Sequence, residues 1–175
     1  MKSKFLINFK YFLINLRKLY SSVLWYELNN IKNIKKSEKK FKIIVLKSKT
    51  NITKFNLNEY FDKYKFKLKR LNKKNHFLAL VIKRKILSSG WIYLGKKWKI
   101  TEINLNVNIK NQNLLYDFYT PKNLRNKGYY KLLLKLIIKK FKKKNLAIYS
   151  LSYNYKSNQA IKKSGFKLIK KIYGF

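Results

Sequence analysis

The chain has 175 residues, of which 44 are Lys or Arg and 6 are Asp or Glu, so its formal net charge is +38. This length suits a single domain with a substantial core. There is no cysteine, and His76 is the only histidine, which excludes disulfides, thiolate catalysis and Cys-based metal sites and argues against a His-centred metal site or a Ser-His-Asp triad.

Most of the positive charge comes from lysine, because the only arginines are Arg17, Arg70, Arg84 and Arg125. Lysine is a solvated point charge, whereas arginine is the usual choice for bidentate recognition of phosphates and bases. The richness in Lys, Asn and Ile also fits a genome biased towards A and T. The charge therefore fits either a basic solvated surface or a dedicated polyanion-binding surface, and both attract anions such as acidic lipid headgroups.

The N-terminal segment, Lys4 to Asn30, is predicted to be a basic amphipathic helix. Its apolar residues recur every three or four positions, at Phe5, Phe9, Phe12, Leu13, Leu16, Leu19, Tyr20, Val23 and Leu24. Such a helix can dock on its own domain, lie in a membrane interface or form an oligomer contact. We expect residues 1–30 to form this helix, 31–40 a polar connector and 41–175 one domain.

No apolar run approaches the roughly 20 residues of a spanning helix. The sequence also shows no uninterrupted apolar region followed by a small-residue cleavage site. We therefore expect a cytoplasmic protein, with peripheral contact at the anionic inner face of the membrane through residues 4–30 as one use of the helix.

The middle of the chain predicts a strand, a helix and three antiparallel strands. The strand is Phe41–Leu46 and the helix is Asn56–Leu71, followed by strands at Phe77–Ile82, Ile86–Leu94 and Trp98–Ile109. In the last of these, apolar and polar residues alternate, which places Glu102 on a polar face.

The C-terminal part predicts a strand, a long helix and three shorter elements. The strand Leu114–Thr120 ends at Pro121, which cannot donate to a ladder. The helix Leu124–Lys144 follows, then the strand Ala147–Leu151, the helix Ser157–Lys163 and the strand Phe166–Tyr173. A strand, a loop with Arg125 and Gly128 and a helix N-terminus together favour a phosphate site, since the first N–H groups of a helix have no intrahelical partner.

Two motifs in this part resemble those of the GNAT superfamily, the acyl-CoA-dependent N-acyltransferases. The family loop Arg/Gln-x-x-Gly-x-Gly/Ala matches at Arg125 and Gly128, with Tyr130 at the usually small position. The later signature, Asn-x-x-Ala/Ser before a helix that ends in Gly-Phe, matches at Asn154, Ser157, Gly165 and Phe166. The resemblance covers roughly the C-terminal third of the chain.

The resemblance implies a mixed α/β fold, with a central, mostly antiparallel twisted sheet flanked by helices, to which the N-terminal amphipathic helix is extra. It implies acetyl-CoA or another acyl-CoA as co-substrate and no metal. The pyrophosphate would lie on the N–H groups of the loop and helix start, with charge from Arg125 or Lys127, and the pantetheine arm beside the preceding strand and the next helix. The implied residues are Phe118, Tyr119, Thr120, Arg125, Asn126, Lys127, Gly128, Tyr129, Tyr130, Asn154 and Ser157.

The implied activity is transfer of an acyl group, most simply acetyl, to an amine by direct attack in a ternary complex. Such a reaction needs a base, and Asp117 is our first candidate and Glu102 our second. Ile161 occupies the position where many relatives carry an acidic tyrosine, so the general acid is unassigned. The acceptor would be a small-molecule amine, such as an amino-sugar or a cell-envelope precursor, with an amine of a ribosomal or other protein as the open alternative.

A second hypothesis is a non-catalytic basic module that keeps the fold and binds RNA or an anionic membrane. Aromatic side chains among lysines can stack on bases. Here, however, the aromatics are spaced as core residues and no RNA-binding motif occurs, so we do not expect specific nucleic-acid recognition.

Overall fold

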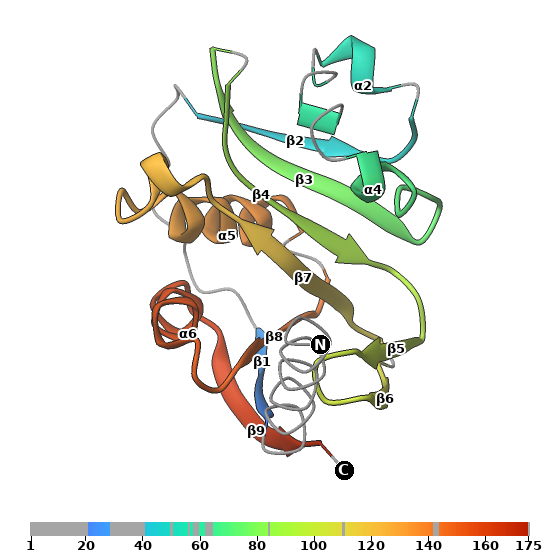
Figure 1. Ribbon diagram of the computed structural model, residues 1–175, viewed down its shortest axis with the longest axis vertical. Helices are drawn as coiled ribbons and strands as arrows, with labels where there is room; N and C mark the ends of the chain where they lie inside the picture. The colour runs from blue at the N-terminus through green and yellow to red at the C-terminus, as the bar shows by residue number, and fades with distance from the viewer. Residues whose placement is uncertain are drawn as a thin grey trace, which may run out of the picture.

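The computed structural model describes residues 21–28, 41–49, 51–55, 57, 60–61, 65–83, 85–109, 111–141 and 144–174. A seven-stranded sheet runs through the molecule in the order β2-β3-β4-β7-β8-β1-β9 (Figure 1). Its strands are β1 (Ser22–Leu28), β2 (Lys42–Leu46), β3 (Asn75–Ile82), β4 (Lys85–Tyr93), β7 (Asn113–Tyr119), β8 (Leu146–Leu151) and β9 (Lys167–Tyr173). The described residues contain no helix that is long and apolar enough to cross a membrane.

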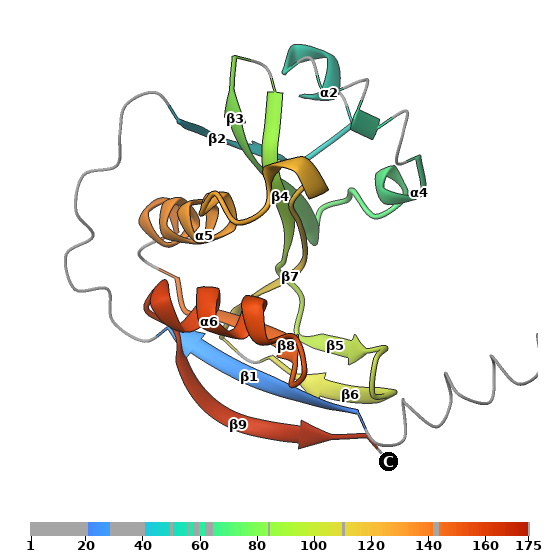
Figure 2. The same ribbon diagram turned by 60° about the vertical axis from the view of Figure 1, so that its left-hand side comes forward.

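The sheet is mostly antiparallel, as predicted, and only β7 and β8 pair in parallel. Helices α5 (Tyr129–Lys140) and α6 (Tyr155–Lys163) cover one face (Figure 2). The short helices α2 (Asn51–Lys54) and α4 (Lys65–Leu68) and the hairpin of β5 (Lys97–Ile100) and β6 (Leu105–Asn108) lie on the other. Apolar side chains fill the space on both faces, so the sheet has a core on each side.

Helix α5 has the predicted apolar face but starts later than predicted. Leu133, Leu134, Ile137 and Ile138 are buried against the sheet. The prediction of a helix from Leu124 is wrong because Gly128 adopts φ 76, a left-handed conformation that interrupts helical dihedrals. Residues Lys122–Leu124 form a 3-10 turn instead, and the helix ends at Lys140 rather than Lys144.

Residues Ser22–Leu28, predicted as the end of the N-terminal helix, form the strand β1. Its burial pattern leaves only Leu24 and Glu27 partly exposed, because β1 lies between β8 and β9 and is covered on both faces. A strand covered on both sides is a near-continuous apolar run, which periodicity alone does not separate from a buried helix. The remainder of the predicted helix, residues 4–20, and the connector 31–40 lie outside the described residues.

The predicted strand Trp98–Ile109 is two strands joined by a turn. Residues 101–104 reverse the chain, with Asn104 at φ 51, so that β5 pairs with β6. Glu102 therefore lies in this turn and not on a strand face. A regular alternation of apolar and polar residues continues through a tight turn without a break, which is why the pattern concealed it.

The other predicted strands are confirmed within a residue or two of their bounds. The predicted helix Asn56–Leu71 lies only partly within the described residues. Within them it is helical at residues 60–61 and in α4.

The parallel strands β7 and β8 separate after a short pairing. They are joined from Asn113–Leu146 to Leu115–Ile148 only, so the C-terminal half of β7 has no partner strand on that side within the described residues. On the other side, the register of β7 against β4 shifts between Ser89 and Trp91. Asp117, at φ 47, is the residue left over in this bulge. The separation and the bulge place the end of β7 beside the starts of α5 and α6.

Candidate functional site

A pocket of about 490 Å³ opens where β7 ends and α5 and α6 begin. The pocket brings together the two sequence motifs, which are separated in the chain by α5 and β8. Its walls are formed by Phe118, Tyr119, Thr120, Leu124, Arg125, Asn126, Gly128, Tyr129, Tyr130, Lys131, Asn154, Lys156, Ser157 and Ala160.

The start of α5 supplies backbone donors to this pocket. Gly128 occupies the N-cap position, where it has no side chain to cap the helix, and the N–H of Leu132 makes the bond to its carbonyl at 2.9 Å. The N–H groups of Tyr129, Tyr130 and Lys131 precede that bond and are the orphan donors of the first turn. A Cβ added at Gly128 would meet no atom within 4 Å, so the space beside the backbone is open. These features fit a phosphate group, which is the chemistry that acyl-CoA would bring.

The opposite wall is the first turn of α6. The side chain of Asn154 caps this helix by accepting from the N–H of Ser157 at 3.3 Å. Ser157 and Ala160 are three residues apart and so lie on the same face of the helix, which is the face that lines the pocket.

Tyr130, the residue at the usually small motif position, bridges the two walls. Its ring packs against Phe118 of β7 with centroids 5.2 Å apart, and its hydroxyl lies 3.4 Å from Oγ of Ser157 on α6. Burial raises the pKa of this phenol, with a smaller opposing effect from the Ser157 hydrogen bond. The hydroxyl is therefore neutral at physiological pH and can both donate and accept.

The predicted donor-site residues line this pocket with one exception, Lys127, which does not. Arg125 lines it, and its Nε donates to the carbonyl of Thr120 at 3.1 Å, an interaction that ties the loop to the end of β7.

The sequence analysis missed Leu124, Lys131, Lys156 and Ala160, which also line the pocket. A helix start at Gly128 would have placed Lys131 in the first turn, and Lys156 and Ala160 flank Ser157 on α6.

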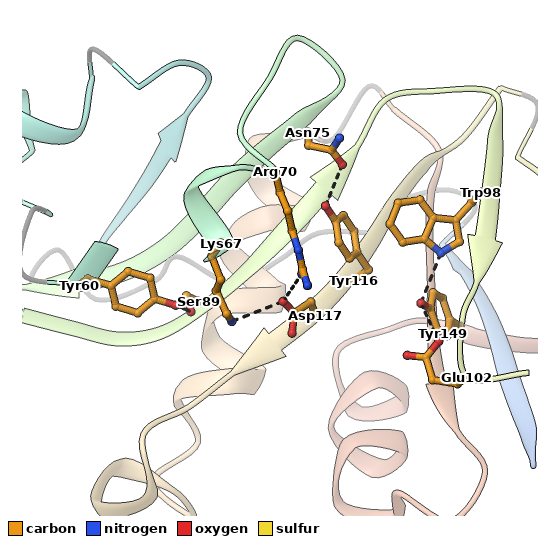
Figure 3. Close-up of polar contacts among 10 residues, drawn as sticks. All are labelled: Tyr60, Lys67, Arg70, Asn75, Ser89, Trp98, Glu102, Tyr116, Asp117 and Tyr149. Carbon is orange, nitrogen blue, oxygen red and sulfur yellow. Dashed lines mark hydrogen bonds and ion pairs between the residues drawn. The ribbon is translucent and has the colours of Figure 1, made fainter. Parts of the chain in front are cut away.

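The first candidate base, Asp117, lies outside the lining of this pocket. Its Oδ2 accepts from Nη1 of Arg70 at 2.7 Å and lies 3.4 Å from Nζ of Lys67 (Figure 3). Both cations come from α4 and the residues after it, so the carboxylate points to the face opposite α5. Oδ2 of Asp117, which would take the proton from the amine, is therefore already paired with two cations.

The second candidate, Glu102, contacts neutral side chains. Its Oε2 accepts from the hydroxyl of Tyr149 at 3.5 Å, and that hydroxyl accepts from Nε1 of Trp98 at 3.3 Å (Figure 3). Burial, and then the charge of Glu102, raise the pKa of Tyr149. Tyr149 lies on β8 just beyond the last residue that pairs with β7. Ile161, at the position of the family's acidic tyrosine, is fully buried in the core.

No protein-family model and no curated protein matches the sequence. Solved structures do match the fold. A GNAT-family acetyltransferase from Colwellia psychrerythraea aligns with a TM-score of 0.54 at 17% identity, over 87% of this chain and 54% of that one. An aminoglycoside acetyltransferase from an uncultured soil metagenomic sample aligns with a TM-score of 0.54 at 12% identity, over 79% and 95%.

A ribosomal-protein-alanine N-acetyltransferase from Brucella melitensis biovar Abortus 2308 aligns with a TM-score of 0.52 at 12% identity, over 77% of this chain and 98% of that one. The chain spans 54% of the length of the Colwellia structure, and 62% and 63% of the length of two further matched structures. Identities this low carry information about the fold alone. The sheet order, the separated β7 and β8 and these alignments agree, and the chain has the fold of the GNAT superfamily.

Proposed function

We propose that this protein is an acyl-CoA-dependent N-acyltransferase that transfers acetyl from acetyl-CoA to an amine. The observation that carries the proposal is the pocket at the start of α5. Backbone donors at a glycine with open space beside it form one end, and the end of β7 and the start of α6 form the walls. A phosphate-bearing ligand with a long thin arm suits this combination of a cradle and a cleft.

In this proposal the loop and the first turn of α5 hold the phosphates, and β7 and α6 hold the arm. Bound acyl-CoA supplies a thioester, whose carbonyl carbon is attacked by the acceptor nitrogen as the C–S bond breaks. The nitrogen must lose a proton and the departing sulfur can take one. Glu102 and Asp117 are the described carboxylates that we propose for the first task, and no residue is assigned to the second.

We propose a small-molecule amine as acceptor. The support is similarity in fold to an aminoglycoside acetyltransferase whose structure contains sisomicin. An amino-sugar, free or within a cell-envelope precursor, is the corresponding acceptor class for this chain. The predicted contact of residues 4–30 with an anionic membrane remains a proposal for residues 4–20 only, since Ser22–Leu28 form an internal strand.

The test is calorimetric titration with acetyl-CoA and CoA in about 0.3 M salt, which screens non-specific attraction to a basic protein. Two matched variants, Gly128→Asp and Gly128→Asn, accompany the wild type. Both residues tolerate left-handed dihedrals and have nearly the same shape, so they differ in the negative charge of the carboxylate and in the N–H donors of the amide. The carboxylate should weaken binding by at least about tenfold relative to the amide, because it would lie in the anion cradle. Equal affinities for the two variants, or no binding by folded wild type, would refute the proposal.

The alternative is the basic binding module without catalysis. Two observations are in its favour, the buried Ile161 at the acid position and the two cations on Asp117. It predicts binding to RNA or anionic vesicles that falls steeply with salt, and no turnover of acetyl-CoA with any amine. Saturable CoA binding at about 0.3 M salt that depends on the charge at position 128 argues for the first proposal.

A further inference from the structure

We infer that the side chain of Tyr130 binds the arm of the donor, by offering its hydroxyl to an amide of the pantetheine chain together with Ser157. The inference rests on the proposed function and adds to it a residue whose side chain has no assigned role. The sequence marked Tyr130 as a departure from the small residue of the resembling motif. The structure shows that the departure is built into the pocket wall.

The position of the ring is fixed by its neighbours. Phe118 packs against it from β7, and Phe118 itself lies over Gly90 of β4, where an added Cβ would overlap the ring at 2.5 Å. Gly90 thus leaves room for Phe118, and Phe118 sets where the ring of Tyr130 lies. The phenol runs from α5 to α6, where its hydroxyl lies 3.4 Å from Oγ of Ser157.

The hydroxyl pair is incompletely satisfied. The distance between the Tyr130 and Ser157 oxygens is 3.4 Å, at the long end for a bond between two hydroxyls. Each hydroxyl has one donor and two acceptor positions, so one long bond leaves capacity on both. Both residues line the pocket, and a buried hydroxyl with spare capacity favours a polar ligand group there.

The pantetheine arm offers the matching chemistry. Its two amides each carry one donor and one acceptor, and they lie between the phosphates and the thioester. In the proposed function the backbone N–H of Tyr130 is one of the donors to the phosphates. The side chain of the same residue would then lie beside the part of the arm that is next to those phosphates. A ligand without the arm would leave the hydroxyl pair as it is.

The experiment compares CoA with adenosine 5′-diphosphate 3′-phosphate, which keeps all the phosphates of CoA and lacks the arm. Tyr130→Phe and Ser157→Ala are titrated with both probes. Tyr155→Phe is the matched control, because its ring starts the same α6 helix but is largely exposed and does not line the pocket. We expect Tyr130→Phe to weaken CoA binding about threefold to tenfold, the effect of one hydrogen bond, and to leave the armless probe unchanged.

Ser157→Ala should lower CoA affinity in the same selective way, and the double variant should lose less than the product of the single losses, because the hydroxyls act as a pair. Equal loss for both probes would overturn the inference, since it would indicate a general disturbance of the pocket. Unchanged CoA affinity in Tyr130→Phe would also overturn it and leave the proposed function standing. Tighter CoA binding by Tyr130→Ala would overturn it by showing that the ring obstructs the arm. Failure of wild type to bind CoA would overturn the proposed function and this inference together.

Discussion

Oδ2 of Asp117 lies 2.7 Å from Nη1 of Arg70, and the two residues meet on the face of the sheet that α5 does not cover. Asp117 reaches that position because it sits in the bulge of β7 at φ 47. The arrangement ties the bulge to the residues after α4. It also changes the ranking of the two candidate bases, since Glu102 receives its hydrogen bonds from the neutral side chains of Thr101 and Tyr149.

Glu102→Gln should lower the rate of acyl transfer more than Asp117→Asn does. A general base contributes about a hundredfold or more, and the Glu102 carboxylate is not held by a cation in the contacts of the described residues. The measurement is kcat/KM with acetyl-CoA and an amine acceptor found by screening, with circular dichroism to check the fold. If Asp117→Asn proves the more damaging change, Asp117 is restored as the first candidate.

The stability of Asp117 variants should follow backbone conformation more than charge. The side chains of Asp117 and Arg70 are 36% and 42% exposed, so their ion pair is worth at most about 1 kcal/mol. Asn tolerates the left-handed region as Asp does, whereas Ala there costs about 1 kcal/mol more. Thermal unfolding should therefore rank Asp117→Asn above Asp117→Ala. The reverse order would mean that the bulge relaxes when the side chain is removed.

Gly90→Ala should destabilise the protein by about 1–3 kcal/mol, because its Cβ overlaps the ring of Phe118 and a packed site accepts an extra methyl group poorly. The measurement is urea unfolding. Phe118→Leu in the same chain is the matched partner, since it removes the ring that the methyl group meets. The double variant should lose less than the sum of the single losses. Strict additivity would show that Gly90 is required for another reason.

Tyr149→Phe should reduce the sensitivity of stability to alkaline pH. Burial raises the pKa of Tyr149 in the folded state above its ordinary value of about 10. Its contribution is therefore complete below about pH 10 and is lost as the pH rises above that, since the unfolded chain then ionises first. The difference in unfolding free energy between wild type and variant should shrink by about 1.4 kcal/mol at about pH 11. Denaturation at pH 8 and pH 11 measures it, and a constant difference would contradict the shift. The two proteins differ at this side chain alone, so the comparison isolates its contribution.

The loop before α5 and the buried face of that helix could be predicted from local sequence, because Arg125, Gly128 and the apolar residues of α5 lie close together in the chain. The start of α5 was misplaced because the positive φ of Gly128 is a tertiary outcome, and the residues before it are not poor helix formers. The pairing of Phe118 with Gly90 and of Tyr130 with Ser157 depends on how distant strands and helices pack. No spacing in the sequence encodes such contacts.

The interpretation of residues 22–28 failed for a related reason. Trp25 and Tyr26 are both buried, on opposite faces of β1, and an apolar segment covered on two sides fits helical spacing as well as strand spacing. Only the neighbouring strands decide between them. The ion pairs of Asp117 could not be predicted from the sequence either, because Arg70 and Asp117 meet through the bulge and not through any motif.

The place of β1 has a consequence for how the protein is made. This strand precedes every other described strand in the sequence, yet both of its partners, β8 and β9, follow all the others, and Ser22 pairs with Tyr173. The seven-stranded sheet therefore cannot close before β9 has been made. Contacts between residues so far apart in sequence slow folding. Until then β1 lacks the strands that help to bury Val23 and Tyr26, and apolar surface exposed during folding is prone to aggregation.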